Sequence, residues 1–387
     1  MDNKRQVCGI IAEYNPFHNG HKYQLELVKK QYGTVVVVMS GSLTQRGDVA
    51  ITDKWSRSRS ALLSGADLVI ELPVVFALNT AERFAFGGIN ILSSLGCVDA
   101  ISFGSECGDA DVLKESAEML INETPAQAEK LQQLMKSGMA YAAAREQVFS
   151  HIPAGILREP NNILAVEYIK QLILAKSPIL PITHKRVGSD YNSTELESRL
   201  SSASAIRANA QSPYIKNQMP ENVYEIFEKS TKHYLSGLDT AAVYFIRHGG
   251  AEALKASLEC VEGLENRIYE AARRFDTIEK IADACSTKRY TKAKIRRIIL
   301  ASMLGITSQM CFEQPSYARV LGATENGRNL LSEIKNKSKL NIITKTADFK
   351  EENEMFKKDI LATDIWALTS NETPSAGQDF TKSPVMI

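Results

Sequence analysis

Short, continuously apolar segments separated by helical patterns constrain the fold of this 387-residue chain more than any other feature. Residues 34–39 read Thr-Val-Val-Val-Val-Met, a β-branched run that is typical of a strand buried on both faces of a parallel sheet. Similar runs lie at 7–12, 67–72 and 100–103, and the segments between them have the period and length of helices. Strands that alternate with helices predict right-handed βαβ crossovers and an α/β fold with a Rossmann-like, doubly wound parallel sheet.

The second half of the chain has a different pattern. One more strand is predicted at 178–187, and beyond it strand-like runs largely vanish, while residues 222–335 have the pattern of successive amphipathic helices. At roughly 150 residues per domain, the length favours two domains. We therefore expect an α/β domain at 1–212 and a mainly α-helical domain at 213–387.

Composition and charge exclude several classes of protein. The 46 Lys and Arg residues and 45 Asp and Glu residues leave a formal net charge of +1, which argues against coating of nucleic acid by bulk electrostatics. The six cysteines form no CxxC pair, no signal peptide precedes the first strand, and no apolar run reaches the ~20 residues of a membrane span. These observations predict a reduced, cytoplasmic protein without a zinc site. The polar end, 369–387, is expected to be a packed loop or a loose end.

Phosphate chemistry is expected first at residues 13–21, Glu-Tyr-Asn-Pro-Phe-His-Asn-Gly-His, between the first strand and the first helix. The carboxyl ends of parallel strands and the N-termini of helices bind phosphates. His18 and His21 can donate hydrogen bonds to phosphate oxygens as charge builds during transfer, and Gly20 lets a nucleotide approach the backbone. The chain has no GxxxxGK[ST] and no GxGxxG after a strand, so nucleotidyl transfer is favoured over P-loop hydrolysis and dinucleotide redox chemistry.

The segment GIIAEYNPFHNGH (9–21) resembles the nucleotidyltransferase superfamily that carries the HxGH motif. Further segments resemble the bacterial tRNA(Met) cytidine acetate ligase family: MSGSLTQRGDVAITDKW (39–55), GADLVIELP (65–73), FGSECGD (103–109), EPNNILAVEYI (159–169), SASAIR (202–207) and KRYTKAKIRR (288–297). This resemblance implies an enzyme that uses ATP to activate acetate as acetyl-adenylate. It also implies transfer of the acetyl group to N4 of the wobble cytidine of elongator tRNA(Met), which forms N4-acetylcytidine.

The resemblance implies an ATP site in which His18 and His21 are the catalytic pair that holds the phosphates. Its main segment comprises Ile11, Ala12, Glu13, Tyr14, Asn15, Pro16, Phe17, His18, Asn19, Gly20, His21, Lys22, Tyr23 and Gln24. Residues that complete the pocket and a second phosphate-binding segment are Gly104, Asn161, Asn162, Arg186, Ser202, Ser204 and Arg207. Taken alone, each of these residues is better explained structurally: Gly104 as a strand-end turn, Asn161 and Asn162 as a helix cap, and Arg186 as a charge on an edge strand.

A polar loop after the second strand lies on the same predicted sheet edge as the histidines. Its candidate substrate-binding residues are Ser40, Gly41, Gln45 and Arg46, and an ordinary solvated loop is the alternative. Glu13 is an odd neighbour for a triphosphate unless Mg2+ or a substrate amine intervenes, so its role stays open. Mg2+ is expected as the usual companion of ATP.

Residues 288–297, here called the basic segment, contain six basic residues and no acid. Basic side chains position an RNA backbone and an aromatic ring can stack on an unpaired base, whereas solvated helix faces usually mix charges of both signs. The predicted tRNA-binding residues are Lys288, Arg289, Tyr290, Lys292, Lys294, Arg296 and Arg297. The rival functions are a small-molecule adenylyltransferase of cofactor biosynthesis and a nucleotide sensor without turnover.

Overall fold

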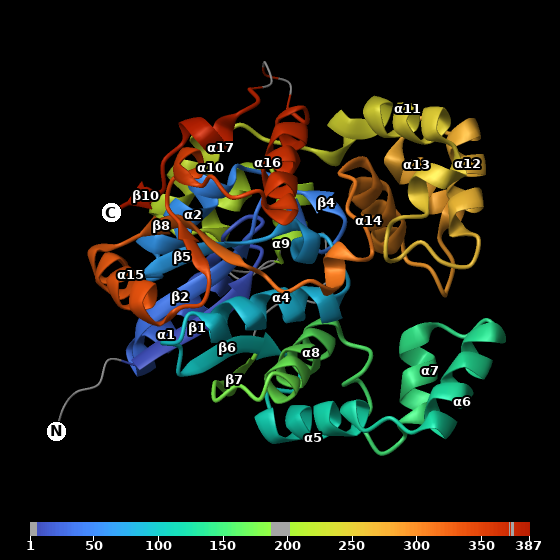
Figure 1. Cartoon of the computed structure of the whole chain (residues 1–387), viewed down its shortest axis with the longest axis horizontal. Coiled ribbons are helices and arrows are strands. Elements are labelled where there is room, and N and C mark those ends of the chain that lie inside the picture. Colours follow the sequence, from blue (N-terminus) through green and yellow to red (C-terminus); the bar gives the residue numbers. More distant parts are fainter. Residues whose placement is uncertain (1–5, 187–201, 371, 373–374) are drawn as a thin grey trace.

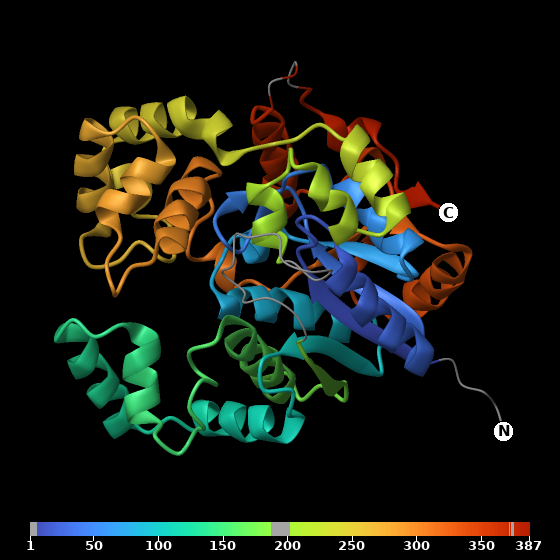
Figure 2. The ribbon, with the colours of Figure 1, turned by 180° about the vertical axis from the view of Figure 1, so that it is seen from behind.

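A central sheet with helices on both faces organises the protein, and two groups of helices project from one side of it (Figure 1). The reverse view shows the helices that cover the other face of the sheet (Figure 2). This computed structural model describes residues 6–186, 202–370, 372 and 375–387.

The described strands build one main sheet in the order β10-β8-β5-β2-β1-β6-β7, and β9 pairs with β8. Their bounds are β1 (Gln6–Ala12), β2 (Gly33–Ser40), β5 (Leu68–Leu72), β6 (Ala100–Ser105), β7 (Leu180–Lys185), β8 (Tyr317–Ala323), β9 (Asn341–Ile343) and β10 (Val385–Met386). Strands β5, β2, β1, β6 and β7 are parallel. Because β2 and β5 lie on one side of β1 and β6 and β7 on the other, the strand order reverses beside β1. The predicted doubly wound parallel sheet is confirmed.

Alternate residues of β2 feed two separate apolar cores, as the β-branched run predicts. Val36 and Val38 face a core that includes α4, whereas Val35 and Val37 face a core that includes α1 and α2. The helices of the first half are α1 (Asn19–Tyr32), α2 (Lys54–Leu63), α3 (Val74–Ala77), α4 (Ala81–Ser94), α5 (Ala110–Ile121), α6 (Pro125–Lys136), α7 (Tyr141–Val148), α8 (Pro160–Leu174) and α9 (Ala203–Ala208).

The second half is mainly helical, as predicted. Its α-helices are α10 (Glu221–Lys229), α11 (Asp239–Gly249), α12 (Leu264–Arg274), α13 (Ile278–Cys285), α14 (Lys292–Met303), α15 (Glu325–Lys337), α16 (Glu354–Ala367) and α17 (Gln378–Thr381). Short 3-10 helices lie at Pro213–Gln218, Leu235–Leu238, Ala251–Leu254, Met310–Phe312 and Thr346–Asp348. Within the described ranges, no helix combines the length and the apolar character that crossing a bilayer requires.

The end of the chain returns to the sheet, which corrects two expectations. Residues 317–323, expected within a series of helices, form β8 and pair antiparallel with β5. The tail was expected to be a loop or a loose end, but it contains α17 and β10, and β10 pairs with β8. β10 has only two residues, and β8 pairs with strands that lie far away in the sequence or in the tail. The sheet therefore continues past residue 212, and the assignment of separate tasks to 1–212 and 213–387 stays a prediction.

Four buried charged residues fix the tail to the sheet and are called the charge cluster here. The Nζ atom of Lys54 lies 2.7 Å from Glu71 Oε1 and 2.7 Å from Asp379 Oδ1. Arg319 lies 3.2 Å from Glu71 Oε2 and also contacts Asp379. Two cations and two carboxylates thus balance one another between α2, β5, β8 and α17.

Asp359 of α16 is buried beside the charge cluster. Its carboxyl oxygens accept hydrogen bonds from the backbone N–H of Val74 at 2.6 Å and from the hydroxyl of Tyr317 at 2.5 Å. Burial, followed by the negative charge of Glu71, raises the pKa of Asp359 to about 8. The folded protein therefore holds a proton there that the unfolded chain releases at about pH 4.

This proton predicts a pH-dependent stability. A carboxyl group whose pKa is raised by folding contributes stability that is complete below its unfolded pKa and is lost as the pH rises to its folded pKa. We expect the free energy of unfolding to fall between pH 5 and pH 8, and to fall less in Asp359→Asn, whose amide mimics the protonated carboxyl. Urea midpoints across this interval measure the effect, and identical pH slopes in the two proteins would contradict it.

Candidate active site

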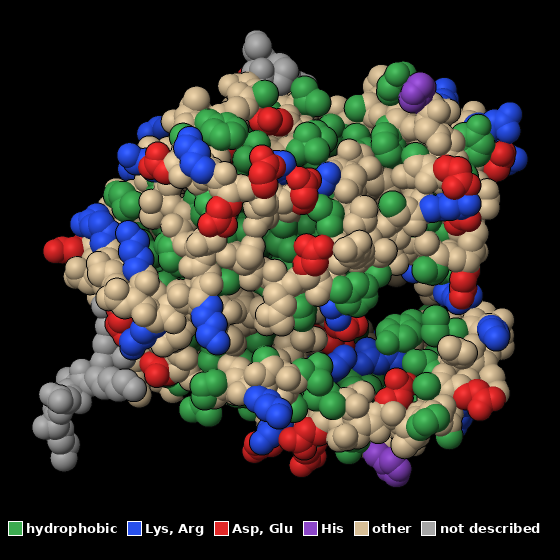
Figure 3. Space-filling view, viewed as in Figure 1, with side chains coloured by type: hydrophobic (Ala, Val, Ile, Leu, Met, Phe, Trp, Pro, Cys, Tyr) green, Lys and Arg blue, Asp and Glu red, His purple; other side chains and the backbone are tan. Residues whose placement is uncertain are grey.

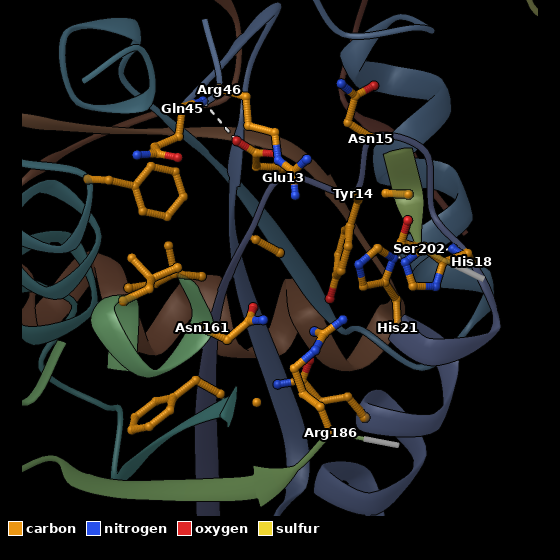
Figure 4. A pocket seen from close by; sticks show the side chains of 18 of the residues that line it. Glu13, Tyr14, Asn15, His18, His21, Gln45, Arg46, Asn161, Arg186 and Ser202 are labelled. Atoms are coloured by element: carbon orange, nitrogen blue, oxygen red, sulfur yellow. Dashed lines mark hydrogen bonds between the residues drawn. The ribbon is translucent and has the colours of Figure 1, made fainter. Parts of the chain in front are cut away.

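A cavity, here called the central cavity, opens at the carboxyl ends of β1 and β6. This is the place where the strand order reverses, and ligands of open parallel sheets bind at such places. Figure 4 shows Tyr14, His18 and His21 on one side of the cavity and Asn161 across from them. It is lined by Ile11, Ala12, Glu13, Tyr14, Asn15, His18, His21, Gln24, Gln45, Arg46, Phe84, Phe103, Gly104, Asn161, Leu164, Tyr168, Arg186, Ser202, Ala203 and Arg207.

The two histidines cap the start of α1 with their Nδ1 atoms. His18 Nδ1 accepts a hydrogen bond from the backbone N–H of Gly20 at 3.1 Å, and His21 Nδ1 accepts one from the backbone N–H of His18 at 3.2 Å. A neutral imidazole that accepts at Nδ1 carries its proton on Nε2. The rings stack with their centroids 3.7 Å apart. The helix start therefore presents two parallel N–H donors beside the cavity.

The histidines are neutral at physiological pH. Burial lowers the pKa of His18 to about 3, with Arg186 and Arg207 as further causes. The pKa of His21 is also well below its usual value because of burial, then because of His18 and Arg186. Positive charge in the cavity therefore comes from Arg46, Arg186 and Arg207, whose guanidinium groups suit the phosphates of a nucleotide.

A small hairpin of β3 (Leu43–Thr44) and β4 (Asp48–Val49) presents part of the candidate substrate loop to the cavity. The backbone N–H of Gln45 donates to Glu13 Oε1 at 2.8 Å, as Figure 4 shows, and Arg46 Nη1 donates to Ser204 Oγ at 2.5 Å. Glu13 thus anchors the hairpin. Ser40 and Gly41 are buried outside the described cavity lining, and Gly41 packs against Glu71.

Several predicted ATP-binding residues support the cavity instead of lining it. Phe17 packs on the rings of Tyr14 and His21, with centroids 4.9 and 5.5 Å apart. Asn19 donates to the carbonyl of Asn217, and Tyr23 is half-exposed on α1. The residues with predicted ATP contacts that fall outside the described lining are Pro16, Phe17, Asn19, Gly20, Lys22, Tyr23, Asn162 and Ser204.

Tyr14 holds an uncommon backbone conformation at the centre of this segment. Its φ is 48°, in the left-handed region that side chains other than glycine rarely occupy. The backbone carbonyl of the next residue, Asn15, accepts from Arg207 Nη1 at 2.6 Å, and Asn15 Oδ1 accepts from the N–H of Ile51 at 2.8 Å. Such contacts hold the strained turn that links β1 to α1.

Asn161 and Asn162 differ in role. Asn162 is buried, and its Oδ1 accepts from the N–H groups of Glu106 at 2.9 Å and Cys107 at 3.0 Å. The Glu106 carboxylate in turn accepts from the N–H groups of both asparagines, at 3.2 and 2.7 Å, so it caps the start of α8. Asn162 thus fastens α8 to the end of β6, whereas the Asn161 side chain reaches the cavity.

The apolar wall of the central cavity was not predicted from the sequence. It is formed by Phe84 of α4, Phe103 of β6, and Leu164 and Tyr168 of α8. All four belong to apolar patterns that also describe core residues, so no local signal separates a cavity wall from a core. This wall suits the flat faces of a base or a small apolar acyl group.

The basic segment is less free to bind RNA than its sequence indicates. Arg296 Nη1 lies 2.9 Å from Glu279 Oε1, Arg289 pairs with Glu262, and Lys292 contacts Asp283. These acids come from α13 and the loop before α12, so the surface does mix charges. The pKa of Lys294 is lowered by burial. Lys288 and Lys292 are the exposed lysines of the segment.

Arg297 connects the basic segment to the β3–β4 hairpin. It is buried, its Nη2 lies 2.7 Å from Glu259 Oε1, and its Nη1 donates to the backbone carbonyl of Gln45 at 2.8 Å. Gly47 has a φ of 67°, and a Cβ atom there would lie 2.8 Å from the backbone nitrogen of Arg297. The hairpin therefore rests directly on α14, and the main contacts of Arg297 are within the protein.

Comparisons with known proteins agree with this geometry. The sequence model of the family described as HIGH Nucleotidyl Transferase matches residues 5–379. The tRNA(Met) cytidine acetate ligase of Thermoanaerobacter sp. (strain X514) is 42% identical over 97% of this chain and 98% of its own. Thermotoga maritima TmcAL is 30% identical in two solved structures, each covering 99% of both chains: one bound with alpha-thio ATP (TM-score 0.89) and one apo (TM-score 0.92). The chain therefore belongs to the tRNA(Met) cytidine acetate ligase family of HIGH nucleotidyl transferases.

Proposed function

We propose that this protein is an ATP-dependent ligase that acetylates N4 of the wobble cytidine in elongator tRNA(Met). The name of its relatives, tRNA(Met) cytidine acetate ligase, gives the tRNA, the modified nucleoside and the acetyl donor. The observation that carries the proposal is the pair of Nε2–H donors of His18 and His21 at the start of α1, beside Arg186 and Arg207. We place the protein in the cytoplasm, where ATP and tRNA meet.

In the first step, a carboxylate oxygen of acetate attacks the α-phosphorus of ATP. A new P–O bond gives acetyl-adenylate, and the bond to the β-phosphate breaks as pyrophosphate leaves with the electron pair. Nε2–H groups of the two histidines and the N–H groups at the start of α1 stabilise the developing charge. Gln45 and Arg46, which line the same cavity, are the residues that we propose orient the acetate. Catalysis is therefore positioning and electrostatics, with no covalent enzyme intermediate.

In the second step, the N4 amine of cytosine attacks the carbonyl carbon of acetyl-adenylate. The C–N bond forms, AMP leaves with the electron pair of the anhydride oxygen, and N4 loses one proton. The division of labour that we propose gives the chemistry to residues 1–212 and tRNA binding to residues 213–387.

Mg2+ is proposed to enter with ATP. Within the part of the chain that the structure describes, no three metal-binding side chains gather into a cluster. A Mg2+ ion bound to nucleotide phosphates keeps several waters and needs only one or two carboxylates. Glu13 is the carboxylate of the described cavity lining, so it is the residue that fits this role.

The decisive experiment follows labelled acetate into RNA. The protein is incubated with ATP, labelled acetate and bulk tRNA, and we expect acetylated cytidine together with pyrophosphate and AMP. Pyrophosphate that forms only with a phosphorylated cofactor precursor would instead identify a small-molecule adenylyltransferase. Nucleotide binding without pyrophosphate under any acceptor would identify a sensor.

Removal of the exposed lysines of the basic segment is expected to weaken tRNA binding without touching adenylation. Lys288→Ala with Lys292→Ala removes two charges that can contact phosphates, so the slope of log affinity against log salt should fall by about 2. Acetate-dependent exchange of pyrophosphate into ATP should stay at the wild-type rate. Titration of tRNA at several salt concentrations measures the change.

A matched control removes the same charge elsewhere. Lys335→Ala with Lys339→Ala changes two exposed lysines of α15 and the following turn, at the end of the molecule opposite α14 (Figure 1). This control should bind tRNA like the wild type. Equal losses in the two double variants would mean that bulk charge, and not the basic segment, attracts the RNA.

A further inference from the structure

A second cavity of about 760 Å³, here called the side cavity, lies between α14 and α7. Its walls come from the starts of α4 and α8, from α7 and α14, and from the β3–β4 hairpin. Figure 3 shows a hollow between the two projecting groups of helices, with Lys and Arg side chains on part of its floor. Its volume lies within the ~300 to 1,000 Å³ of small-molecule sites.

The side cavity adjoins the central cavity. Gln45 and Arg46 line both, and the first turn of α8 contributes Pro160 to one and Asn161 to the other. A group held in the side cavity therefore faces the hairpin that borders the proposed acetyl-adenylate. The other wall is α14, which carries the basic segment.

The side cavity contains an aromatic ring, that of Tyr141, on which a base could stack. Tyr141 of α7 leaves 48% of its surface exposed, and the guanidinium of Arg145 lies 5.2 Å from the centre of its ring. Arg145 is buried and lies 3.9 Å from Glu167 of α8, which pairs with Lys170 at 2.9 Å. This chain of contacts fixes the ring before any ligand arrives. Aromatic rings and guanidinium planes are the surfaces on which unpaired bases stack.

A half-exposed carboxylate also lines the side cavity, that of Glu82 in the first turn of α4. One of its oxygens, Oε1, accepts a hydrogen bond from Arg83 at 2.5 Å. A carboxylate is the usual partner of the exocyclic amine of cytosine. Stacking surface, carboxylate and basic wall together fit a single-stranded nucleotide that carries an amino group on its base.

We infer that the side cavity receives the target cytidine, flipped out of the anticodon loop, and that Tyr141 positions its base by stacking. This inference rests on the proposed function and names the acceptor site. The base enters beside α14, and its amine points between Gln45 and Arg46 toward the central cavity. Flipping a base out costs little free energy in a loop whose bases are already unpaired.

The test separates the two half-reactions. Tyr141→Ala should lower the rate of acetyl transfer to tRNA by about 5- to 150-fold, the usual effect of losing one base–aromatic stack. Acetate-dependent exchange of pyrophosphate into ATP should not change, and Tyr141→Phe should transfer at close to the wild-type rate. Tyr244→Ala, which removes a tyrosine 67% exposed on α11, is the matched control and should change neither reaction.

Three results would overturn the inference alone: transfer by Tyr141→Ala at the rate of the control, equal losses in Tyr141→Phe and Tyr141→Ala, or a loss of exchange as large as the loss of transfer. A wild-type protein that adenylates acetate but transfers no label to RNA would overturn the proposed function itself. The two failures are therefore distinguishable.

A binding measurement supports the rate measurement. An anticodon stem-loop RNA with the fluorescent base pyrrolocytosine at the wobble position reports stacking through quenching of its emission. We expect quenching on binding to the wild type and to Tyr141→Phe, and loss of most of it with Tyr141→Ala. Equal quenching by all three proteins would overturn the assignment of Tyr141.

Discussion

Replacement of His21 by alanine is expected to lower acetate-dependent exchange of pyrophosphate into ATP by about 100- to 1,000-fold. The change removes one of two fixed N–H donors at the point where negative charge develops, and loss of one such donor typically has an effect of this size. It also removes the hydrogen-bond acceptor of the His18 backbone N–H, which costs about 1 kcal/mol of stability. The protein should therefore remain folded.

Two variants make the His21 result specific. His248→Ala changes a histidine of α11 that stacks on Tyr244 outside the central cavity, and it should exchange pyrophosphate at the wild-type rate. His21→Gln keeps an N–H donor and should recover part of the activity. An alanine variant with full exchange and an unchanged melting midpoint would remove His21 from the mechanism.

The largest loss of stability is expected from Lys54→Met. Lys54 has no exposed side-chain surface and contacts two carboxylates, Glu71 and Asp379. Without it, Arg319 alone faces both buried negative charges, and breaking such a pair typically costs about 3–5 kcal/mol. Urea unfolding measures the loss, and limited proteolysis should cut the tail after α16 sooner, because Asp379 holds α17 in place.

A charge-balanced double variant tests the cause. Lys54→Met combined with Glu71→Gln again leaves one cation and one carboxylate in the charge cluster. We expect the double variant to be more stable than Lys54→Met alone, although it changes more residues. If the two substitutions simply add, the cluster is not stabilised by charge balance, and the loss reflects packing of the lysine side chain.

The parallel half of the sheet could be predicted because each of its strands has a recognisable pattern within its own short stretch of sequence. The run at 35–39 is apolar at every position, which suits β2 because both faces of that strand are covered. β8 could not be found in this way. It contains Arg319, a charged residue that is tolerated inside only because Glu71 and Asp379 surround it, and those partners come from distant parts of the sequence.

In the candidate site, too, the features set by a contiguous motif could be predicted, and those that depend on residues distant in the sequence could not. The histidine pair follows from a contiguous motif, since the helix start and the preceding strand fix where both rings lie. The acids that pair with the basic segment, Glu259, Glu262, Glu279 and Asp283, come from neighbouring structure and cancel a charge that looks unopposed in sequence. Outside the histidine motif, the aromatic side chains of the two cavities could not be assigned from the sequence, because a ring that lines a cavity and a ring in the core have the same local pattern. These residues are Phe84, Phe103, Tyr168 and Tyr141.

The contact between α14 and the β3–β4 hairpin has a thermodynamic consequence. The hairpin contacts Glu13 of the central cavity and Ser204 of α9, and Arg297 and Gly47 join it to the helix that carries the basic segment. One small element thus connects the cavity proposed for ATP with the helix proposed to bind RNA. Linkage is reciprocal: any change in RNA affinity that bound ATP causes through the hairpin must equal, in free energy and in sign, the change in ATP affinity that bound RNA causes.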